Sequence, residues 1–156
     1  MVRMTAELIA PCGMNCALCA SYLAYISDVP KKAGKVSHCT GCRPRDKQCA
    51  FIKKRCAKIG RKEVDFCFEC GAMPCADLLR VDRLYRTKYG MSLVANLGFL
   101  RAKGTAAFLR SQKKEHACAE CGDVVCVHDG KCCACGAITE PRMPLKPLPK
   151  RPGPRA

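Results

Sequence analysis

The chain lacks tryptophan altogether and has only five phenylalanines and four tyrosines among 156 residues. Its hydrophobic core must therefore come from leucine, isoleucine, valine, methionine and alanine, and we expect that core to be thin. A chain of this length makes one modest domain or two very small ones. Small domains with thin cores need cross-links, such as disulfides or bound metals, to be stable.

Side chains suited to catalysis are scarce as well. The chain has three histidines, His38, His116 and His128, all in segments that we expect to be loops. We find no Ser/His/Asp set, no phosphate-binding loop and no paired carboxylates, so little general-base capacity is available. These absences favour a binding or structural role over an enzymatic one.

The sequence has no apolar run of membrane-spanning length. Its first residues carry one arginine, a short apolar run broken by Glu7 and no small-residue cleavage site, so they do not read as a secretory signal. We therefore expect a cytoplasmic protein that does not associate with membranes. In that reducing compartment thiols are retained and structural disulfides are rare.

Cysteine is the abundant residue, at 16 positions, and five pairs have C-x-x-C spacing. Such pairs suit one tetrahedral ion better than a structural disulfide, and we predict two to three Zn²⁺ sites. Cys126, Cys133, His116 and His128 are surplus to this pattern. Any of them could substitute as a ligand, and the preferred substitution is Cys133 for Cys132. The predicted metal ligands are Cys12, Cys16, Cys19, Cys39, Cys42, Cys49, Cys56, Cys67, Cys70, Cys75, Cys118, Cys121, Cys132 and Cys135.

The first three cysteines leave two interpretations open. Cys12, Cys16 and Cys19 have the C-x3-C-x2-C spacing with which radical enzymes hold one [4Fe–4S] cluster with an open iron. Alternatively, they belong to a closed zinc site that a distant cysteine completes, for which Cys75 is our candidate. In that case the CTGC and CFEC knuckles, at residues 39–42 and 67–70, would pair as a second site.

Apolar periodicity and capping residues predict helices over residues 17–27, 46–59, 76–89, 93–103 and 106–114. In a straight helix over 46–59, the Cα atoms of Cys49 and Cys56 would lie about 10.5 Å apart. One ion with metal–sulfur bonds of about 2.3 Å would struggle to bridge them. Either that helix breaks, or the two thiols serve different sites, or one of them is a buried apolar cysteine.

The C-terminal part contains two C-x-x-C-G knuckles, at 118–122 and 132–136. This spacing is typical of a zinc ribbon made of two short hairpins. The predicted fold is accordingly small, metal-stabilised and mostly α-helical, with irregular Cys-rich loops and C-terminal zinc-ribbon-like β hairpins. Its predicted parts are a Cys-rich metal-binding unit (1–75), a helical segment packed on it (76–114), a ribbon-like unit (115–138) and a disordered, basic, Pro-rich tail (139–156).

The formal net charge is +15, with every thiol counted as neutral. A zinc ion held by four thiolates adds 2 − 4 = −2, so three such sites would leave 15 − 6 = +9. The basic region at 43–62 and the tail could bind nucleic acid. They could equally balance the charge of the sulfur sites while the protein acts on a protein partner that the sequence does not identify.

Several of these motifs occur in the order found in a known family. They are C-G-x-x-C-x-x-C-x-x-Y from Cys12, C-x-G-C at 39–42, C-A at 56–57, C-x-E-C-x-x-x-P-C at 67–75, and Asn96-Leu97. Over residues 10–136 the chain resembles the domain of unknown function family 3795, which consists of small cysteine-rich proteins. The resemblance implies metal binding, usually presumed to be zinc, and no assigned reaction.

Three functions are consistent with these observations. The first is a structural zinc protein that acts as an interaction module, because zinc closed by four thiolates has no open position for a substrate. The second is an iron–sulfur protein that serves as a redox carrier or accessory factor. The third is a basic zinc-ribbon protein that binds nucleic acid.

Overall fold

The computed structural model of the chain describes residues 1–45 and 55–150. Within these ranges, no helix is long and apolar enough to cross a membrane. Short 3-10 turns are η1 (Ala6–Leu8), η2 (Cys16–Leu18) and η3 (Cys67–Glu69). The α-helices are α1 (Ala20–Ile26), α2 (Cys42–Arg45), α4 (Ala57–Gly60), α5 (Ala76–Tyr89), α6 (Leu93–Lys103) and α7 (Thr105–Glu115).

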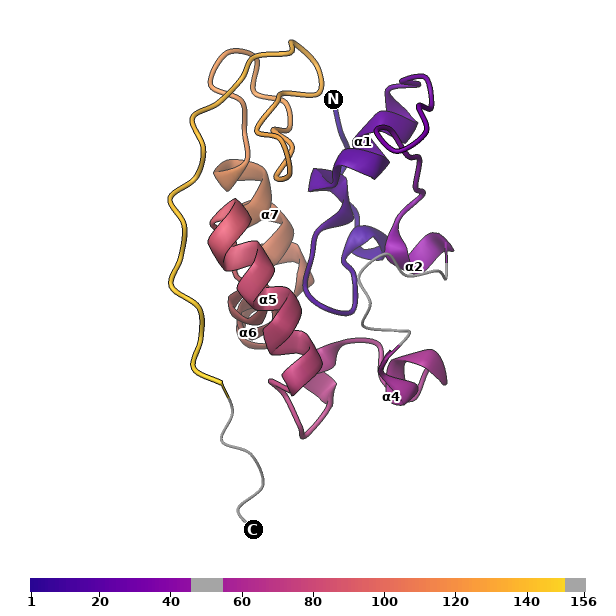
Figure 1. The fold of residues 1–156 in the computed structure, drawn as a ribbon, viewed down its shortest axis with the longest axis vertical. Coiled ribbons are helices and arrows are strands. Elements are labelled where there is room, and N and C mark those ends of the chain that lie inside the picture. Colours follow the sequence, from indigo (N-terminus) through magenta and orange to yellow (C-terminus); the bar gives the residue numbers. More distant parts are fainter. Residues whose placement is uncertain (46–54, 151–156) are drawn as a thin grey trace.

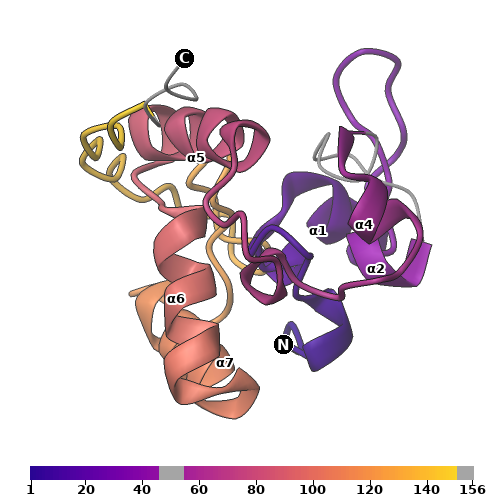
Figure 2. The same cartoon turned by 90° about the horizontal axis from the view of Figure 1, so that it is seen from below.

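Two groups of elements lie side by side (Figure 1). Helix α6 packs against both α5 and α7, and the segment that contains α1, α2 and α4 lies beside these three helices, as Figure 2 also shows. The two groups share one core, because η1 contacts α7 and η3 contacts α6. The largest fully buried apolar side chains are Phe108, Ile9, Leu18, Leu78, Leu93 and Leu97.

Helices α5 and α6 begin and end where the sequence predicts. At the start of α5, the Sγ atom of Cys75 accepts a hydrogen bond from the N–H of Leu78 at 3.5 Å, and Gly90 ends this helix in the left-handed conformation with φ 61°. Ser92 caps α6, since its Oγ accepts from the N–H of Ala95 at 3.0 Å. Helix α7 extends one residue beyond the predicted range at each end.

Two predicted helices differ from those observed. The helix predicted at 17–27 starts only at Ala20, because Cys19 has an extended backbone (φ −83°, ψ 134°) and the residues before it form η2. Cys56 is also extended (φ −101°, ψ 105°), so the helix predicted at 46–59 breaks there and α4 follows. Residues 46–54, and with them Cys49, lie outside the described residues.

The prediction of C-terminal zinc-ribbon-like β hairpins is wrong. Residues 117–138 form only isolated antiparallel bridges, and the described part of the chain contains no β-strand. Tight turns lie between the two partners of the bridges at 117–124 and 131–138. In these turns the N–H of Gly122 donates to Cys118 O at 2.9 Å and that of Gly136 donates to Cys132 O at 3.1 Å. The N–H of Val127 donates to Leu18 O at 3.0 Å, so it is not available to a ladder within this segment. The irregular Cys-rich loops are present as predicted.

Residues 139–150 run as an extended segment along the outer side of α5 (yellow in Figure 1). The N–H of Leu145 donates to the carbonyl oxygen of Arg86 at 2.8 Å. Arg142 forms an ion pair with Glu115, at the end of α7, with a distance of 2.8 Å. This segment therefore contacts both the second half of α5 and the end of α7.

Candidate metal centre

Four cysteine sulfurs converge in the segment that follows α7. The Sγ atoms of Cys118, Cys121, Cys132 and Cys135 all lie within 4.8 Å of one another. The Cys118–Cys135 and Cys121–Cys132 sulfur–sulfur distances are 3.7 and 3.5 Å. Around an ion with metal–sulfur bonds of about 2.3 Å, four tetrahedral sulfurs are separated by about 3.8 Å. The arrangement can therefore hold one tetrahedral metal ion.

Two similar turns position these thiols. In the first knuckle, the N–H of Cys118 donates to Asp123 O at 2.7 Å, and its carbonyl oxygen accepts from the N–H of Gly122 at 2.9 Å. Cys132 makes the same two bonds with the residues at the same offsets in the second knuckle, at 2.8 and 3.1 Å. In each knuckle the first cysteine is buried and the second is exposed. One side of the centre is therefore open for an ion to enter from solvent.

The environment of Cys132 favours its thiolate. Burial opposes ionisation, but the backbone N–H groups of Cys135 and Ala134 and the side chains of Cys121 and Cys135 outweigh it, and the pKa of Cys132 is lowered to about 7. Because the thiolate is the form of cysteine that binds metals, this residue can begin metal capture near neutral pH. The other thiols of the centre then lose their protons as they bind.

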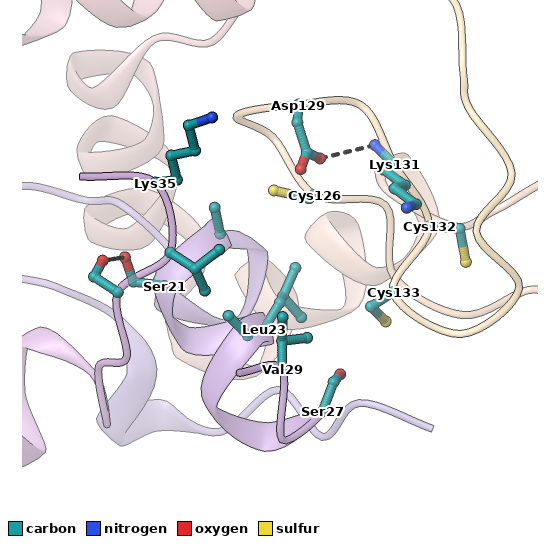
Figure 3. Close-up of a pocket in the computed structure, with 14 residues that line it drawn as sticks. Ser21, Leu23, Ser27, Val29, Lys35, Cys126, Asp129, Lys131, Cys132 and Cys133 are labelled. Atoms are coloured by element: carbon teal, nitrogen blue, oxygen red, sulfur yellow. Dashed lines mark hydrogen bonds between the residues drawn. The ribbon is translucent and has the colours of Figure 1, made fainter. Parts of the chain in front are cut away.

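Cys126 and Cys133 are not members of this set. The Sγ atom of Cys132 belongs to the four-sulfur set, whereas that of its neighbour Cys133 does not. Burial raises the pKa of Cys126 to about 12 and that of Cys133 to about 11, so both stay protonated at neutral pH. Both line a cavity of about 410 Å³ between α1 and the loop at 126–133, and Figure 3 shows the Cys126 side chain pointing toward the α1 side of it.

A second group of cysteines lines another cavity, of about 420 Å³. It comprises Cys16 and Cys19 before α1 and Cys39 and Cys42 around the start of α2. Two of the thiols accept backbone hydrogen bonds: the N–H of Gly41 donates to Cys39 Sγ and the N–H of Cys42 donates to Cys16 Sγ, both at 3.4 Å. The sulfurs of this group lie further apart than those of the C-terminal group. Within the described residues, only the C-terminal set brings three or more Cys, His, Asp or Glu ligand atoms within 4.8 Å of one another.

A third group surrounds Cys67, which is buried beside α6. Burial, and after it the negative charges of Cys12, Cys75, Cys56 and Cys70, raises the pKa of the Cys67 thiol. The other four cysteines are therefore close enough to Cys67 to act electrostatically on its thiol. Their mutual repulsion as thiolates would be relieved by a bound cation.

The structure groups the N-terminal cysteines differently from the expected pairing. The knuckle at 39–42 lies with Cys16 and Cys19, whereas the knuckle at 67–70 lies with Cys12 and Cys75. The spacing of cysteines along a chain indicates which residues form a knuckle. It says nothing of which knuckles meet, because that depends on how the intervening segments fold.

From the sequence, His128 is only a surplus residue that could substitute as a metal ligand, yet in the structure it links three parts of the molecule. Its Nδ1 accepts a hydrogen bond from the N–H of Ala20, the first residue of α1, at 3.1 Å. Its Nε2 lies 3.0 Å from the hydroxyl oxygen of Tyr85 in α5. His128 and Tyr85 both line the cavity that contains the second cysteine group. No local sequence pattern could have shown this, because the partners are far apart in the chain.

Fold and sulfur groups together define a small, mostly helical, cysteine-rich protein with the capacity to bind metal. Residues 8–80 match the model of a family described as protein of unknown function (DUF3795). The resemblance that the cysteine spacing indicated is thereby confirmed over these residues, while the four-sulfur centre at 118–135 lies beyond them. No curated protein and no solved structure matches the chain.

Proposed function

We propose that the protein is a zinc-binding structural and interaction module, with zinc held by Cys118, Cys121, Cys132 and Cys135. The observation that carries this proposal is the convergence of the four thiols, with sulfur–sulfur distances of 3.5 and 3.7 Å in two pairs. Thiolates favour zinc or iron over hard ions such as magnesium and calcium. Zinc closed by four thiolates has no open position for a substrate, so its binding free energy contributes to folding.

The segment at 117–138 depends on such a contribution. Its local hydrophobic cluster has three buried residues, Cys118, Val125 and Cys132, and two of these are ligands of the proposed ion. Burial of one valine contributes about 1.5–3 kcal/mol. A structural zinc ion contributes about 10–16 kcal/mol at neutral pH in small zinc-binding peptides. We propose that the ion orders the part of this segment around the four thiols, while Val124, Cys126 and Val127 are held by their burial in the main core.

The group around Cys67 supplies thiols for a further zinc site, in keeping with the two to three sites that the sequence predicts. We place the protein in a reducing compartment such as the cytoplasm, because thiols persist there.

Adjacent cysteines provide a matched test of the C-terminal centre. We would purify the unmutated chain, Cys132→Ser and Cys133→Ser without oxygen and count bound metal by native mass spectrometry and elemental analysis. Cys132→Ser is expected to lose one zinc per chain, while Cys133→Ser keeps the full number, since only Cys132 belongs to the four-sulfur set. Equal metal content in the two variants would contradict the proposed ligand set.

A further inference from the structure

Cys16, Cys19, Cys39 and Cys42 come from two separate segments but line one cavity of about 420 Å³. All four are described residues, and no three of their sulfurs come within 4.8 Å of one another. A single tetrahedral ion would draw its ligands to sulfur–sulfur distances of about 3.8 Å. The wider spacing around an open space therefore fits a centre larger than one ion.

We propose that these four thiols bind an iron–sulfur cluster. Four cysteine thiolates are the usual ligands of [2Fe–2S] and [4Fe–4S] clusters alike. Because a cluster distributes its ligands over several irons, the ligand sulfurs stand further apart than they do around one ion. This ligand set replaces the one considered from the sequence, which combined Cys12 with Cys16 and Cys19, because Cys39 and Cys42 line the same cavity as Cys16 and Cys19 and Cys12 does not.

Backbone groups around the cavity favour the thiolate form of two ligands. Cys39 Sγ accepts from the N–H of Gly41 and Cys16 Sγ accepts from the N–H of Cys42, both at 3.4 Å. Hydrogen bonds of this kind stabilise bound thiolate and raise the reduction potential of a cluster. The donors of both bonds are the N–H groups of residues 41 and 42. The CTGC knuckle would therefore stabilise one thiolate in each of the two segments.

Charge and exposure indicate what the cluster would do. Two of the four thiols are buried and two are half-buried, so one side of the cluster lies close to the surface. Arg45 and Arg80 line the same cavity and partly offset the negative charge of four thiolates. With every ligand supplied by the protein, no iron is open to a substrate. The cluster therefore transfers single electrons to a redox partner at this surface.

The test is reconstitution of the full chain with ferric iron, sulfide and a thiol reductant in the absence of oxygen, so that the ferric iron of the cluster is supplied directly and the thiol reduces any excess. We expect absorbance at about 400 nm and equal amounts of iron and acid-labile sulfide, with about two or four of each per chain according to the cluster type. Cys39→Ser and Cys42→Ser are expected to lose most of this absorbance, whereas Cys133→Ser, at a cysteine outside both proposed sites, retains it. A colourless product, or equal loss in Cys133→Ser, would overturn the proposal.

A second measurement needs no variant and so does not depend on whether a substituted chain folds. Thiol alkylation followed by peptide mass mapping should show Cys16, Cys19, Cys39 and Cys42 protected in the reconstituted chain and reactive once the cluster is removed. The reactivity of Cys133 should not change. Unchanged reactivity of the four would refute the ligand set. Failure of the C-terminal zinc centre can be told apart from failure of this proposal, because the two sites use different cysteines and peptide mapping reports each cysteine separately.

Discussion

The carboxylate of Asp82, in α5, has no solvent exposure and three hydrogen-bond donors. Its Oδ1 accepts from Ser92 Oγ and from the N–H of Val94, both at 3.0 Å, and its Oδ2 accepts from Arg86 Nε at 2.7 Å. Asp82 thus ties the end of α5 to the start of α6. A buried charge of this kind is stable only while its partners remain in place.

We predict that Asp82→Ala destabilises the fold by about 3–5 kcal/mol, because it leaves Arg86 without its buried partner. Urea denaturation of the metal-loaded protein would measure the change. Glu63→Ala is the control, since Glu63 pairs with Arg61 at 2.7 Å on an exposed surface, and a pair of this kind contributes about 1 kcal/mol or less. Similar losses in the two variants would show that the Asp82 network adds nothing beyond a surface ion pair.

His128 has its protonation state fixed by its contacts. Because Nδ1 accepts from the N–H of Ala20, the neutral ring carries its proton on Nε2 and donates it to the Tyr85 hydroxyl. Burial is the main cause that lowers the pKa of His128; Asp129 raises it and Lys88 lowers it. The ring of Tyr89 lies 5.0 Å from the imidazole, centroid to centroid, and completes the surroundings. If Nδ1 were protonated, its N–H would face the N–H of Ala20, and neither group could accept a hydrogen bond from the other.

The lowered pKa of His128 has a definite consequence for stability. The unfolded chain binds a proton here near pH 6.5, while the folded chain binds it only at lower pH. The stabilisation is therefore complete above about pH 6.5 and is lost as the pH falls toward the folded pKa. Imidazole ¹⁵N shifts followed by NMR should show that the neutral Nε2–H tautomer predominates at pH 6.5, where an unperturbed imidazole is about half protonated. A midpoint at or above pH 6.5 would be inconsistent with the buried contacts.

Among the elements, sequence patterns correctly predicted the parts of the fold that depend on residues close together in the chain. Leucine periodicity with Ser92 and Gly90 at the ends gave the bounds of α5 and α6, and C-x-x-C-G spacing identified the four thiols that converge. The hairpins were predicted wrongly because the N–H of Val127 bonds to Leu18 O, more than a hundred residues away. The grouping of the N-terminal knuckles could not be predicted for the same reason.

At Gly90, the end of α5 lies so close to the extended segment at 139–150 that a side chain would not fit. Its φ of 61° is left-handed, and a Cβ atom there would lie 2.5 Å from Met143 O and 2.8 Å from Arg142 Cβ. We predict that Gly90→Ala destabilises the fold by at least about 1 kcal/mol, the cost of the left-handed conformation alone. It should also speed hydrogen exchange at Leu145, whose N–H bonds to Arg86 O.

Gly98 is the matched control for this prediction. It lies within α6 with open space around its Cα, so Gly98→Ala should stabilise the fold by about 0.5–1 kcal/mol through helix propensity. Thermal unfolding of both variants in parallel would compare them. A Gly90→Ala variant as stable as Gly98→Ala would mean that the 139–150 segment does not pack on α5 as described.

For the whole molecule, the formal charge of +15 bears on the choice of partner. One zinc tetrathiolate lowers it by 2, and the proposed cluster lowers it further. We predict that binding to single-stranded nucleic acid, followed by fluorescence anisotropy, is weak and falls steeply as salt rises, since aromatic residues for stacking are few. Tight binding that persists at high salt would instead indicate a specific nucleic-acid site.

The first residues of the chain contact the segment that carries the C-terminal centre. Asp123 Oδ1 accepts from the N–H of Val2 at 3.0 Å, and the amino terminus lies 3.9 Å from Asp123 Oδ2. The N–H of Val127 donates to Leu18 O at 3.0 Å. A metal that orders residues 117–138 therefore also positions the N-terminal residues that precede α1.

We predict that chelation of zinc under reducing conditions unfolds the molecule in part. Amide hydrogen exchange should rise at Cys118, Cys132 and Val2, because their hydrogen bonds depend on the segment that the metal orders. The amides of α6 should stay protected, because Leu97 and Leu100 pack in the main core away from the four thiols. In Cys118→Ser, the three amides that respond to chelation should already exchange fast before chelator is added. The chelator should then increase their exchange rates only a little. Uniform loss of protection along the chain would show that the centre and the helical core unfold as one unit.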